Sequence, residues 1–434
     1  MTVTAPPRPP RLSDPVSREE LEALVEALIE EARQRARRRR QKYAAVAGSV
    51  ALVAVAVTTA FERSAQSQSA SVALAVRSDL SGAAASPKIA FITGRRSLCA
   101  NPPRCMGPPR GSAALNGKLY VVNADGSGLR LVAQKASAAA APAWSPDGQK
   151  LAFQSPDGIY GVNADGSGLQ NLTPSPKGGS SPAWSPDGQK IAFERWIDKR
   201  VVSPGALRVN EEIYVMNADG SRTQNLTRSP KPDAGPAWSP DGQKIAFRRV
   251  VGVIPCGTGG CGTADSDIYV MNADGSGQQN LTRKAAFRLG SPAWSPDGQK
   301  LAFQRRSKGT NWEIFVINAD GSGQRNLTRN RSHDMDAAWS PDGRRIVFRT
   351  TRHGKWEVYV MNANGSGQRR LTRTAANEAR PRWSPDGRKI AFTREVGGNF
   401  ELYVMNTDGS GQKRLTPNSP VDRWVAYAWS PAQK

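Results

Sequence analysis

The residues best suited to chemistry in this 434-residue sequence are the imidazole and two carboxylates of His333-Asp334-Met335-Asp336. Such a group can bind a divalent metal ion or act as a general base. His353 is the one other histidine of the chain, so a metal centre built from several histidines is excluded. We predict that His333, Asp334 and Asp336 belong to a recognition surface, with no catalytic residue, no cofactor and no metal ion.

Two further kinds of active site are missing from the sequence. A serine hydrolase of the α/β class needs a Gly-x-Ser-x-Gly turn, and the chain contains none. The Gly-Ser-Gly runs that follow Asn-Ala-Asp lack the lysine and the helix of a phosphate-binding loop. We therefore predict a protein that is not an enzyme.

The four cysteines form two close pairs along the sequence, Cys99 with Cys105 and Cys256 with Cys261. An even number at close spacing is typical of local disulfides in an oxidising compartment. A metal site is the alternative, although the two pairs lie far apart in sequence and the chain has two histidines. We predict one disulfide within each pair.

The elements that must position these residues repeat along the chain. The tetrad Trp-Ser-Pro-Asp begins at six positions, and a degenerate seventh copy begins at Trp429; the six are Trp144, Trp184, Trp238, Trp294, Trp339 and Trp383. The spacings of 40 to 56 residues are typical of β-propellers, in which one small sheet repeats around an axis. The tryptophans are expected to pack between neighbouring blades.

One repeat, residues 236–282, contains four β-rich runs separated by turns, which predicts a four-stranded blade. Ser239-Pro240-Asp241-Gly242 predicts a type I turn closed by a left-handed glycine. Asn272-Ala273-Asp274-Gly275 predicts a second turn, in which the asparagine bonds back to the chain. These aspartates are interpreted as turn residues, because one carboxylate lacks the six or more oxygen ligands that Ca²⁺ prefers.

The number of blades follows from the strand motifs, each of which occurs seven times. The first Ile-Ala-Phe, at Ile89, has no Trp-Ser-Pro before it, and the last Trp-Ser-Pro, at Trp429, has no Ile-Ala-Phe after it. We predict that the 425–430 strand completes the blade that begins at Lys88. The expected fold is an all-β, seven-bladed propeller over residues 88–434, with no edge strand left over.

The repeats Pro-Ala-Trp-Ser-Pro-Asp-Gly-Gln-Lys-Ile-Ala-Phe and Ile-Tyr-Val-Met-Asn-Ala-Asp-Gly resemble the TolB-like propeller repeats of bacterial envelope proteins, which are WD-repeat-like in pattern. The resemblance covers about residues 88–434 and implies a propeller that binds envelope proteins. TolB-like proteins have six blades and a small α/β domain before them. Here the count is seven, and residues 1–87 do not resemble that domain.

The N-terminal region predicts a membrane anchor. Residues 43–61 are rich in Ala and Val and carry no charge, and 19 helical residues reach about 28 Å. The arginine-rich residues 33–42 precede them, so the positive-inside rule places residues 1–42 in the cytoplasm and the propeller outside. A cleaved signal peptide is the alternative. Residues 17–42 predict a basic amphipathic helix opened by a capping box, and residues 62–87 predict a flexible linker.

The net charge of +23 favours anionic partners. Nucleic acid is excluded as a partner by the predicted extracytoplasmic location, whether periplasmic or at the cell surface. Anionic wall polymers, lipid headgroups and acidic proteins remain. Asn-Leu-Thr, which recurs at Asn171, Asn225, Asn280 and Asn326, matches a glycosylation sequon but is interpreted as strand sequence because it occupies one blade position.

The loops indicate where such a partner binds. Both short turns of a blade lie on one face, whereas the variable insertions 94–117, 194–210 and 248–267 lie on the other. Function usually resides on such loops, and Trp196 lies on one of them. We predict a non-catalytic scaffold that displays loops to an envelope protein. The alternatives are a binder of anionic wall glycan or lipid headgroups, and a propeller-type lyase or hydrolase with its site over the central channel near His333. The oligomeric state stays open.

Overall fold

The computed structural model describes residues 86–94, 117–174, 178–203, 206–251, 256–257, 260–261, 265–283, 287–307, 311–416 and 424–432. The predicted cytoplasmic helix, the anchor at 43–61, residues 62–85 of the linker, and Cys99 with Cys105 lie outside these residues. In the described part of the chain, no helix is long and apolar enough to cross a membrane.

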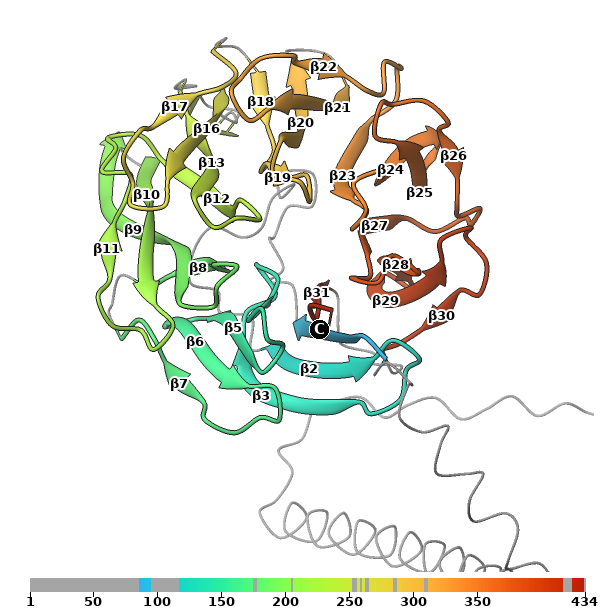
Figure 1. The fold of residues 1–434 in the computed structure, drawn as a ribbon, viewed down its shortest axis with the longest axis horizontal. Coiled ribbons are helices and arrows are strands. Elements are labelled where there is room, and N and C mark those ends of the chain that lie inside the picture. The colour runs from blue at the N-terminus through green and yellow to red at the C-terminus, as the bar shows by residue number, and fades with distance from the viewer. Residues whose placement is uncertain are drawn as a thin grey trace, which may run out of the picture. The chain divides into compact units, whose positions relative to one another are not determined.

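The described strands form a ring of seven sheets, which confirms the all-β, seven-bladed propeller (Figure 1). Blades 1 to 3 consist of β1 (Lys88–Gly94), β2 (Gly117–Asn123), β3 (Arg130–Ala136) and β31 (Trp424–Trp429); β4 (Ala143–Trp144), β5 (Lys150–Ser155), β6 (Gly158–Asn163) and β7 (Gln170–Asn171); and β8 (Ser180–Trp184), β9 (Lys190–Ser203), β10 (Ala206–Asn217) and β11 (Gln224–Asn225).

Blades 4 to 7 follow the same antiparallel plan. They consist of β12 (Asp233–Trp238), β13 (Lys244–Val250), β16 (Ser266–Asn272) and β17 (Gln279–Asn280); β18 (Phe287–Leu289) and β19 (Ala293–Trp294) with β20 (Lys300–Ser307), β21 (Trp312–Asn318) and β22 (Arg325–Asn326); β23 (Asp334–Trp339), β24 (Arg345–His353), β25 (Lys355–Asn362) and β26 (Arg369–Arg370); and β27 (Glu378–Trp383), β28 (Lys389–Val396), β29 (Asn399–Asn406) and β30 (Lys413–Arg414).

The second strand of each blade forms the core because its Ile-Ala-Phe motif is buried on both faces. In blade 4, Ile245, Ala246 and Phe247 are fully buried. Phe247 pairs across the ladder with Tyr269, and their ring centroids lie 5.6 Å apart. Aromatic cross-strand pairs of this kind recur in the other blades and stabilise the sheets.

The two short turns have the predicted backbone form. In Ser239-Pro240-Asp241-Gly242 the amide of Gly242 donates to the Ser239 carbonyl oxygen at 2.9 Å, and Gly242 has φ +72°. The second turn needs one correction. The side chain that accepts a backbone hydrogen bond is Asp274, from the Ser276 amide at 2.9 Å, whereas the Asn272 amide group donates to the Ser276 hydroxyl.

The ring closes as predicted, with the C-terminal strand β31 inside blade 1. The order of that sheet is β3-β2-β1-β31, with Ile89 opposite Trp429 and Gly94 opposite Trp424. The Ser430 amide donates to the Lys88 carbonyl oxygen at 2.7 Å, and the Lys88 amide donates to the Ser430 hydroxyl at 3.0 Å. The first and last strands of the propeller therefore share one sheet.

The repeat tryptophans connect neighbouring blades, as the sequence predicts. The indole Nε1 of Trp144 donates to the Ala428 carbonyl oxygen at 3.2 Å, and that of Trp294 donates to the Ala237 oxygen at 3.0 Å. Six tryptophans make this bond to the preceding blade. The exception among the described residues is Trp383, whose buried Nε1 has no hydrogen-bond partner.

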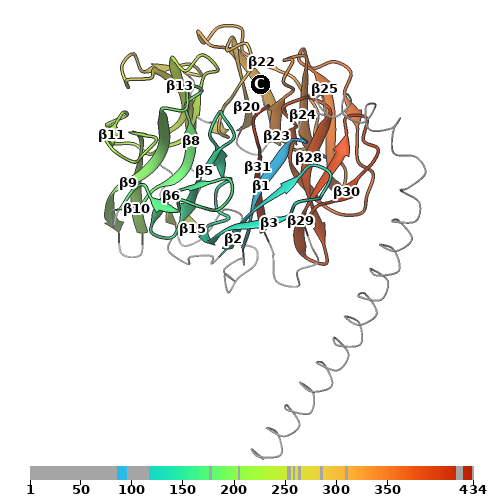
Figure 2. The ribbon, with the colours of Figure 1, turned by 60° about the horizontal axis from the view of Figure 1, so that its bottom comes forward.

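The propeller has two different faces. The turn face carries the Ser-Pro-Asp-Gly and Asn-Ala-Asp-Gly turns, and the loop face carries the connections between second and third strands and between blades. On the loop face, the insertion 194–210 forms a long hairpin of β9 and β10, drawn in green in Figure 2. The insertion 248–267 contains the short strands β14 (Cys256–Gly257) and β15 (Gly260–Cys261).

Candidate functional site

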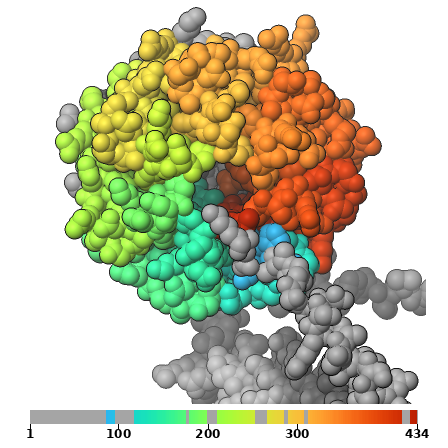
Figure 3. All heavy atoms as spheres, in the orientation of Figure 1, coloured from blue at the N-terminus to red at the C-terminus, as the bar shows by residue number. Residues whose placement is uncertain are grey.

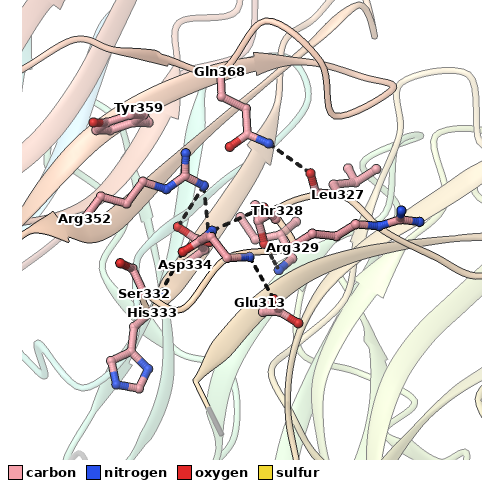
Figure 4. A network of polar contacts seen from close by, with 12 residues as sticks. Glu313, Leu327, Thr328, Arg329, Ser332, His333, Asp334, Arg352, Tyr359 and Gln368 are labelled. Carbon is pink, nitrogen blue, oxygen red and sulfur yellow. Dashed lines mark hydrogen bonds and ion pairs between the residues drawn. The ribbon is translucent and has the colours of Figure 1, made fainter.

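His333, Asp334 and Asp336 lie at the start of the inner strand β23, but they do not form one site. The His333 Nδ1 accepts a hydrogen bond from the Trp312 amide at 3.1 Å, and the His333 amide donates to the Thr351 hydroxyl. Figure 4 shows the His333 imidazole pointing away from the Asp334 carboxylate. Burial and the nearby Arg306 lower the pKa of His333. The described residues contain no cluster of metal-ligating side chains.

Asp334 is a fully buried structural carboxylate. Its oxygens lie 3.4 Å from the Arg352 Nη2, and the Asn330 side chain donates to it (Figure 4). The Arg352 guanidinium lies over the Tyr359 ring at 5.3 Å. These contacts use both oxygens of Asp334 within its own blade.

A buried carboxylate of the inner strand is also bound by an arginine of the second strand in two other blades, where the arginine lies directly opposite the carboxylate. In blade 4, Arg249 holds the buried Asp233 through both carboxylate oxygens, at 2.7 and 2.8 Å, and lies over the Tyr269 ring at 4.6 Å. In blade 7, Arg394 bonds the buried Glu378 at 2.7 Å. Because the pair repeats around the ring, we interpret it as a part of blade architecture and not as a reactive group.

Asp336 has a different environment, at a bulge of the inner strand where its φ is +58°. Its carboxylate lies 2.8 Å from the Arg349 Nε and accepts a hydrogen bond from the Arg380 amide at 3.1 Å. Its own amide donates to the Gln304 side chain of blade 5 at 2.9 Å. Burial opposes the charge of Asp336, but Arg349, Arg382 and Arg380 outweigh burial and lower its pKa.

Arg380 continues this chain of contacts into blade 1. Its Nη1 lies 3.4 Å from the Val425 carbonyl oxygen. The single proton of the Tyr427 hydroxyl is shared between the carbonyl oxygens of Arg380 and, at 2.8 Å, Ala391. Burial lowers the pKa of Arg380, and repulsion from Arg382 and Arg349 lowers it further, while Asp336 opposes them. Three positively charged guanidinium groups thus lie near one carboxylate at the junction of blades 6 and 7, and Arg349 forms an ion pair with it.

A cavity of about 370 Å³ lies beside this cluster, on the side of the turn face. Its lining includes Trp238, Trp294 and Trp339 with neighbouring alanines and prolines, and one charged residue, Arg382. All the lining residues belong to the inner strands or to the turns that follow them. Figure 3 shows the ring hollowed at its centre.

Arg380 and Arg382 are not among the residues predicted from the sequence. A signal was present, because the other inner strands read Ala-Trp, whereas blade 7 reads Arg380-Pro381-Arg382-Trp383. The Arg382 side chain contacts the carbonyl oxygens of Pro381 and Asp336, at 2.8 and 3.2 Å. This site is identified by residues that differ from the repeat, and not by the types of residue that usually act in catalysis.

Trp196, which the sequence predicts to be a recognition residue, lies on the β9–β10 hairpin, where its Nε1 donates to the Glu211 carboxylate at 2.9 Å. Pairing continues outward to Ser203 and Ala206, although the inner strand β8 pairs with β9 no further than Glu194. The outer part of the hairpin is therefore a two-stranded ribbon on the loop face.

The predicted disulfides remain predictions. The register places Cys256 opposite Cys261 in the ladder of β14 and β15, a backbone arrangement in which a local bridge is expected. Cys99 and Cys105 lie outside the described residues.

Asn-Leu-Thr is strand and turn sequence. In blade 4 the Asn280 side chain donates to the Asp267 carboxylate at 2.8 Å and accepts from the Thr282 amide at 3.0 Å, and the Thr282 hydroxyl accepts from the Ile268 amide at 3.1 Å. The asparagine is thus engaged inside its blade, which favours the structural interpretation over glycosylation.

The repeats are similar in sequence to those of TolB proteins. Residues 262–432 match the family model described as the TolB beta propeller domain. The Tol-Pal system protein TolB of Alcanivorax borkumensis is 35% identical over 91 residues, which is 21% of this chain and 18% of that protein. The TolB homolog of Chlorobium luteolum is 32% identical over 124 residues, 21% of this chain and 28% of that protein. The chain thus matches less than a third of the length of each relative.

Solved structures share the fold at low sequence identity. A puromycin-hydrolyzing peptidase of Mycobacterium tuberculosis has a TM-score of 0.57 and 13% identity, over 78% of this chain and 54% of that one. An oligogalacturonate lyase from Vibrio parahaemolyticus has a TM-score of 0.53 and 14% identity, over 67% and 83%. These likenesses concern the propeller fold alone. The family model over residues 262–432 and the TolB relatives show that the propeller is TolB-like.

Proposed function

We propose that this chain is a non-catalytic binding scaffold of the cell envelope, and that its loop face presents a site to a protein partner. The observation that carries the proposal is the ribbon of β9 and β10, which extends beyond the inner strand of its blade. A rigid ring that holds an extended hairpin clear of the sheet is suited to recognition, because little of its frame must be ordered on binding.

His333 and Asp334 already bond to other residues of the propeller, and this supports a binding role over a catalytic one. His333 and Asp334 are held by Trp312, Arg352 and Asn330, and each bond fixes a strand or a connection. A general base must be within reach of a substrate proton. In the part of the chain that the structure describes, the two carboxylates next to His333 in sequence form ion pairs with arginines, Asp334 with Arg352 and Asp336 with Arg349.

The envelope location is part of the proposal and comes from the apolar residues 43–61 and the basic residues before them. The net charge of +23 favours an acidic partner surface. It also favours the second candidate, an anionic wall glycan or lipid headgroup, for which affinity should fall steeply as salt rises.

The test is capture of the partner by the full chain in intact cells. Residues 197–210 are replaced by Val-Gly-Gly-Asn, the tip of the blade 7 hairpin, where Val396 pairs with Asn399 and Gly397 and Gly398 have φ +58° and +82°. The graft is matched in register, because Trp196 pairs with Glu211 as Glu395 pairs with Phe400. The control is Asn364→Asp, which gives a turn on the opposite face the Asn-Ala-Asp-Gly sequence found in blades 1 to 5.

We expect one protein to be crosslinked by the parent and by the Asn364→Asp chain, and to be lost with the grafted tip. Equal capture by all three chains would place the site away from the ribbon. Binding of wall polymer that disappears at high salt, without a protein partner, would replace the proposal by the second candidate.

A further inference from the structure

The central cavity on the side of the turn face has the chemistry of a small-molecule site. Three indole rings from successive blades, those of Trp238, Trp294 and Trp339, lie in its wall. Each is half-buried, and each uses its one polar atom, Nε1, in a bond to the preceding blade. The indole atoms that remain for the cavity are apolar.

Arg382 brings a charge into this apolar wall. At the equivalent position, one residue before the repeat tryptophan, the other six blades have alanine: Ala143, Ala183, Ala237, Ala293, Ala338 and Ala428. Small side chains at this position leave space along the axis of the ring. In blade 7 the longer side chain of Arg382 lines this space.

The charge of Arg382 is not matched by an ion pair. Its side chain contacts two carbonyl oxygens, of Pro381 and Asp336, and no carboxylate of the described residues lies within ion-pair distance of it. The one nearby carboxylate, Asp336, is bound by Arg349 and by the Arg380 amide. Arg380 and Arg349 add two more positive charges behind Arg382, and together they make the potential at this wall positive.

From this combination we infer that the cavity binds a small organic anion, with a carboxylate at Arg382 and a ring-sized apolar body against the indoles of blades 4, 5 and 6. A guanidinium matches a carboxylate geometrically and remains charged. A mostly apolar cavity with one fixed polar group is typical of ligand sites, and 370 Å³ lies within their usual size range. The inference is independent of the proposed function, which concerns the opposite face.

The same chemistry is offered by a free carboxylic acid and by the C-terminus of a peptide. Two probe pairs distinguish these sources: benzoate with benzamide, and N-acetyl-alanyl-phenylalanine with its C-terminal amide. Binding to the full chain in detergent is measured by ligand-observed NMR and equilibrium dialysis at fixed salt.

Two variants of blade 7 make a matched comparison, because each installs the residue that other blades already have. Arg382→Ala gives the Ala-Trp of the neighbouring inner strands, and Arg388→Gln gives the glutamine of four other turns on the same face, at Gln149, Gln189, Gln243 and Gln299. Each removes one positive charge. Arg382→Gln serves as a second variant of similar length if Arg382→Ala melts below the parent.

We expect benzoate to bind the parent and Arg388→Gln with equal affinity. Benzamide should bind the parent at least about tenfold more weakly than benzoate, because it lacks the charge of a carboxylate. Arg382→Ala should lose about tenfold or more in benzoate affinity, because the charge-assisted hydrogen bonds are lost. Binding of the peptide acid in place of benzoate would assign the site to a chain terminus. The inference is overturned if acid and amide bind alike, if neither acid binds, or if both arginine variants weaken binding to the same extent.

Discussion

The hydrogen bonds of the repeat tryptophans allow a direct comparison of two substitutions. Trp144 and Trp383 are similarly buried, with 8% and 6% of their surface exposed. Trp144 donates to the Ala428 oxygen of the closing strand at 3.2 Å, whereas the Nε1 of Trp383 is buried without a partner. Phenylalanine at either position removes the same part of the indole, so the loss of apolar burial largely cancels between the two variants.

The remaining difference is the hydrogen bond. Trp144→Phe deletes a bond worth about 1 kcal/mol and deprives a carbonyl oxygen of one donor. Trp383→Phe deletes a donor whose unmet desolvation costs about 1–3 kcal/mol. The Arg345 guanidinium over the Trp383 ring, at 5.0 Å, keeps an aromatic partner in the variant. We therefore expect Trp144→Phe to lower the free energy of unfolding by about 2–4 kcal/mol more than Trp383→Phe, the sum of these two effects.

Urea unfolding of the full chain in detergent, followed by circular dichroism, gives both free energies at a fixed m-value. The double variant should show additive losses, because the two tryptophans lie in different blades. Equal losses for the single variants, or a larger loss for Trp383→Phe, would show that these bonds do not hold neighbouring blades together.

Three further predictions concern the turns, the cysteines and the closing strand. Asp320 accepts hydrogen bonds from the hydroxyl and amide of Ser322, and these bonds lower the pKa of Asp320. The ionised carboxylate therefore stabilises the fold fully at pH values above its ordinary pKa of 3.8, and this stabilisation is lost as the pH falls through the lowered pKa. Asn364 makes the same bonds in blade 6, so Asp320→Asn should keep the turn and reduce the fall of the melting temperature between pH 5 and about 2; an unchanged pH dependence would contradict this. Peptide mapping of the unreduced full chain should find Cys256 linked to Cys261 and Cys99 to Cys105, and four thiols labelled without reductant would disprove both bridges. Deletion of residues 425–434 removes the inner strand of blade 1 and should lower the melting temperature by more than 10 °C, roughly the effect of several kcal/mol; a deletion mutant that melts like the parent would refute the closure.

Much of the propeller could be predicted from the sequence because its determinants are local and repeated. Trp-Ser-Pro-Asp, Ile-Ala-Phe and Asn-Ala-Asp-Gly each specify a strand or a turn within a few residues, and counting them gave seven blades and the closing strand. The atoms that satisfy each turn were harder to assign, since Asp274 and Asn272 both have suitable side chains and only the geometry separates their roles.

The candidate site could be predicted only in part, because its contacts connect residues far apart in sequence. Asp334 and Asp336 are two residues apart, yet one is bound by Arg352 inside a blade and the other by Arg349 beside the cluster of blades 6 and 7. Alternation along a regular strand would place both side chains on the same face, and the bulge between Met335 and Ala338 separates their surroundings. The importance of Arg382 depends on the space left by alanines of other blades, which no single repeat contains.

The pairing of β1 with β31 has a consequence for biosynthesis. Lys88 and Ser430, which exchange backbone and hydroxyl bonds, are separated by 342 positions. Blade 1 therefore lacks its inner strand until residues 424–429 have been translated, whereas blades 2 to 7 can form in order as the chain is made. Until then β1 exposes an unpaired edge, which makes the nascent protein most vulnerable to aggregation at its oldest blade and gives a chaperone a defined strand to protect.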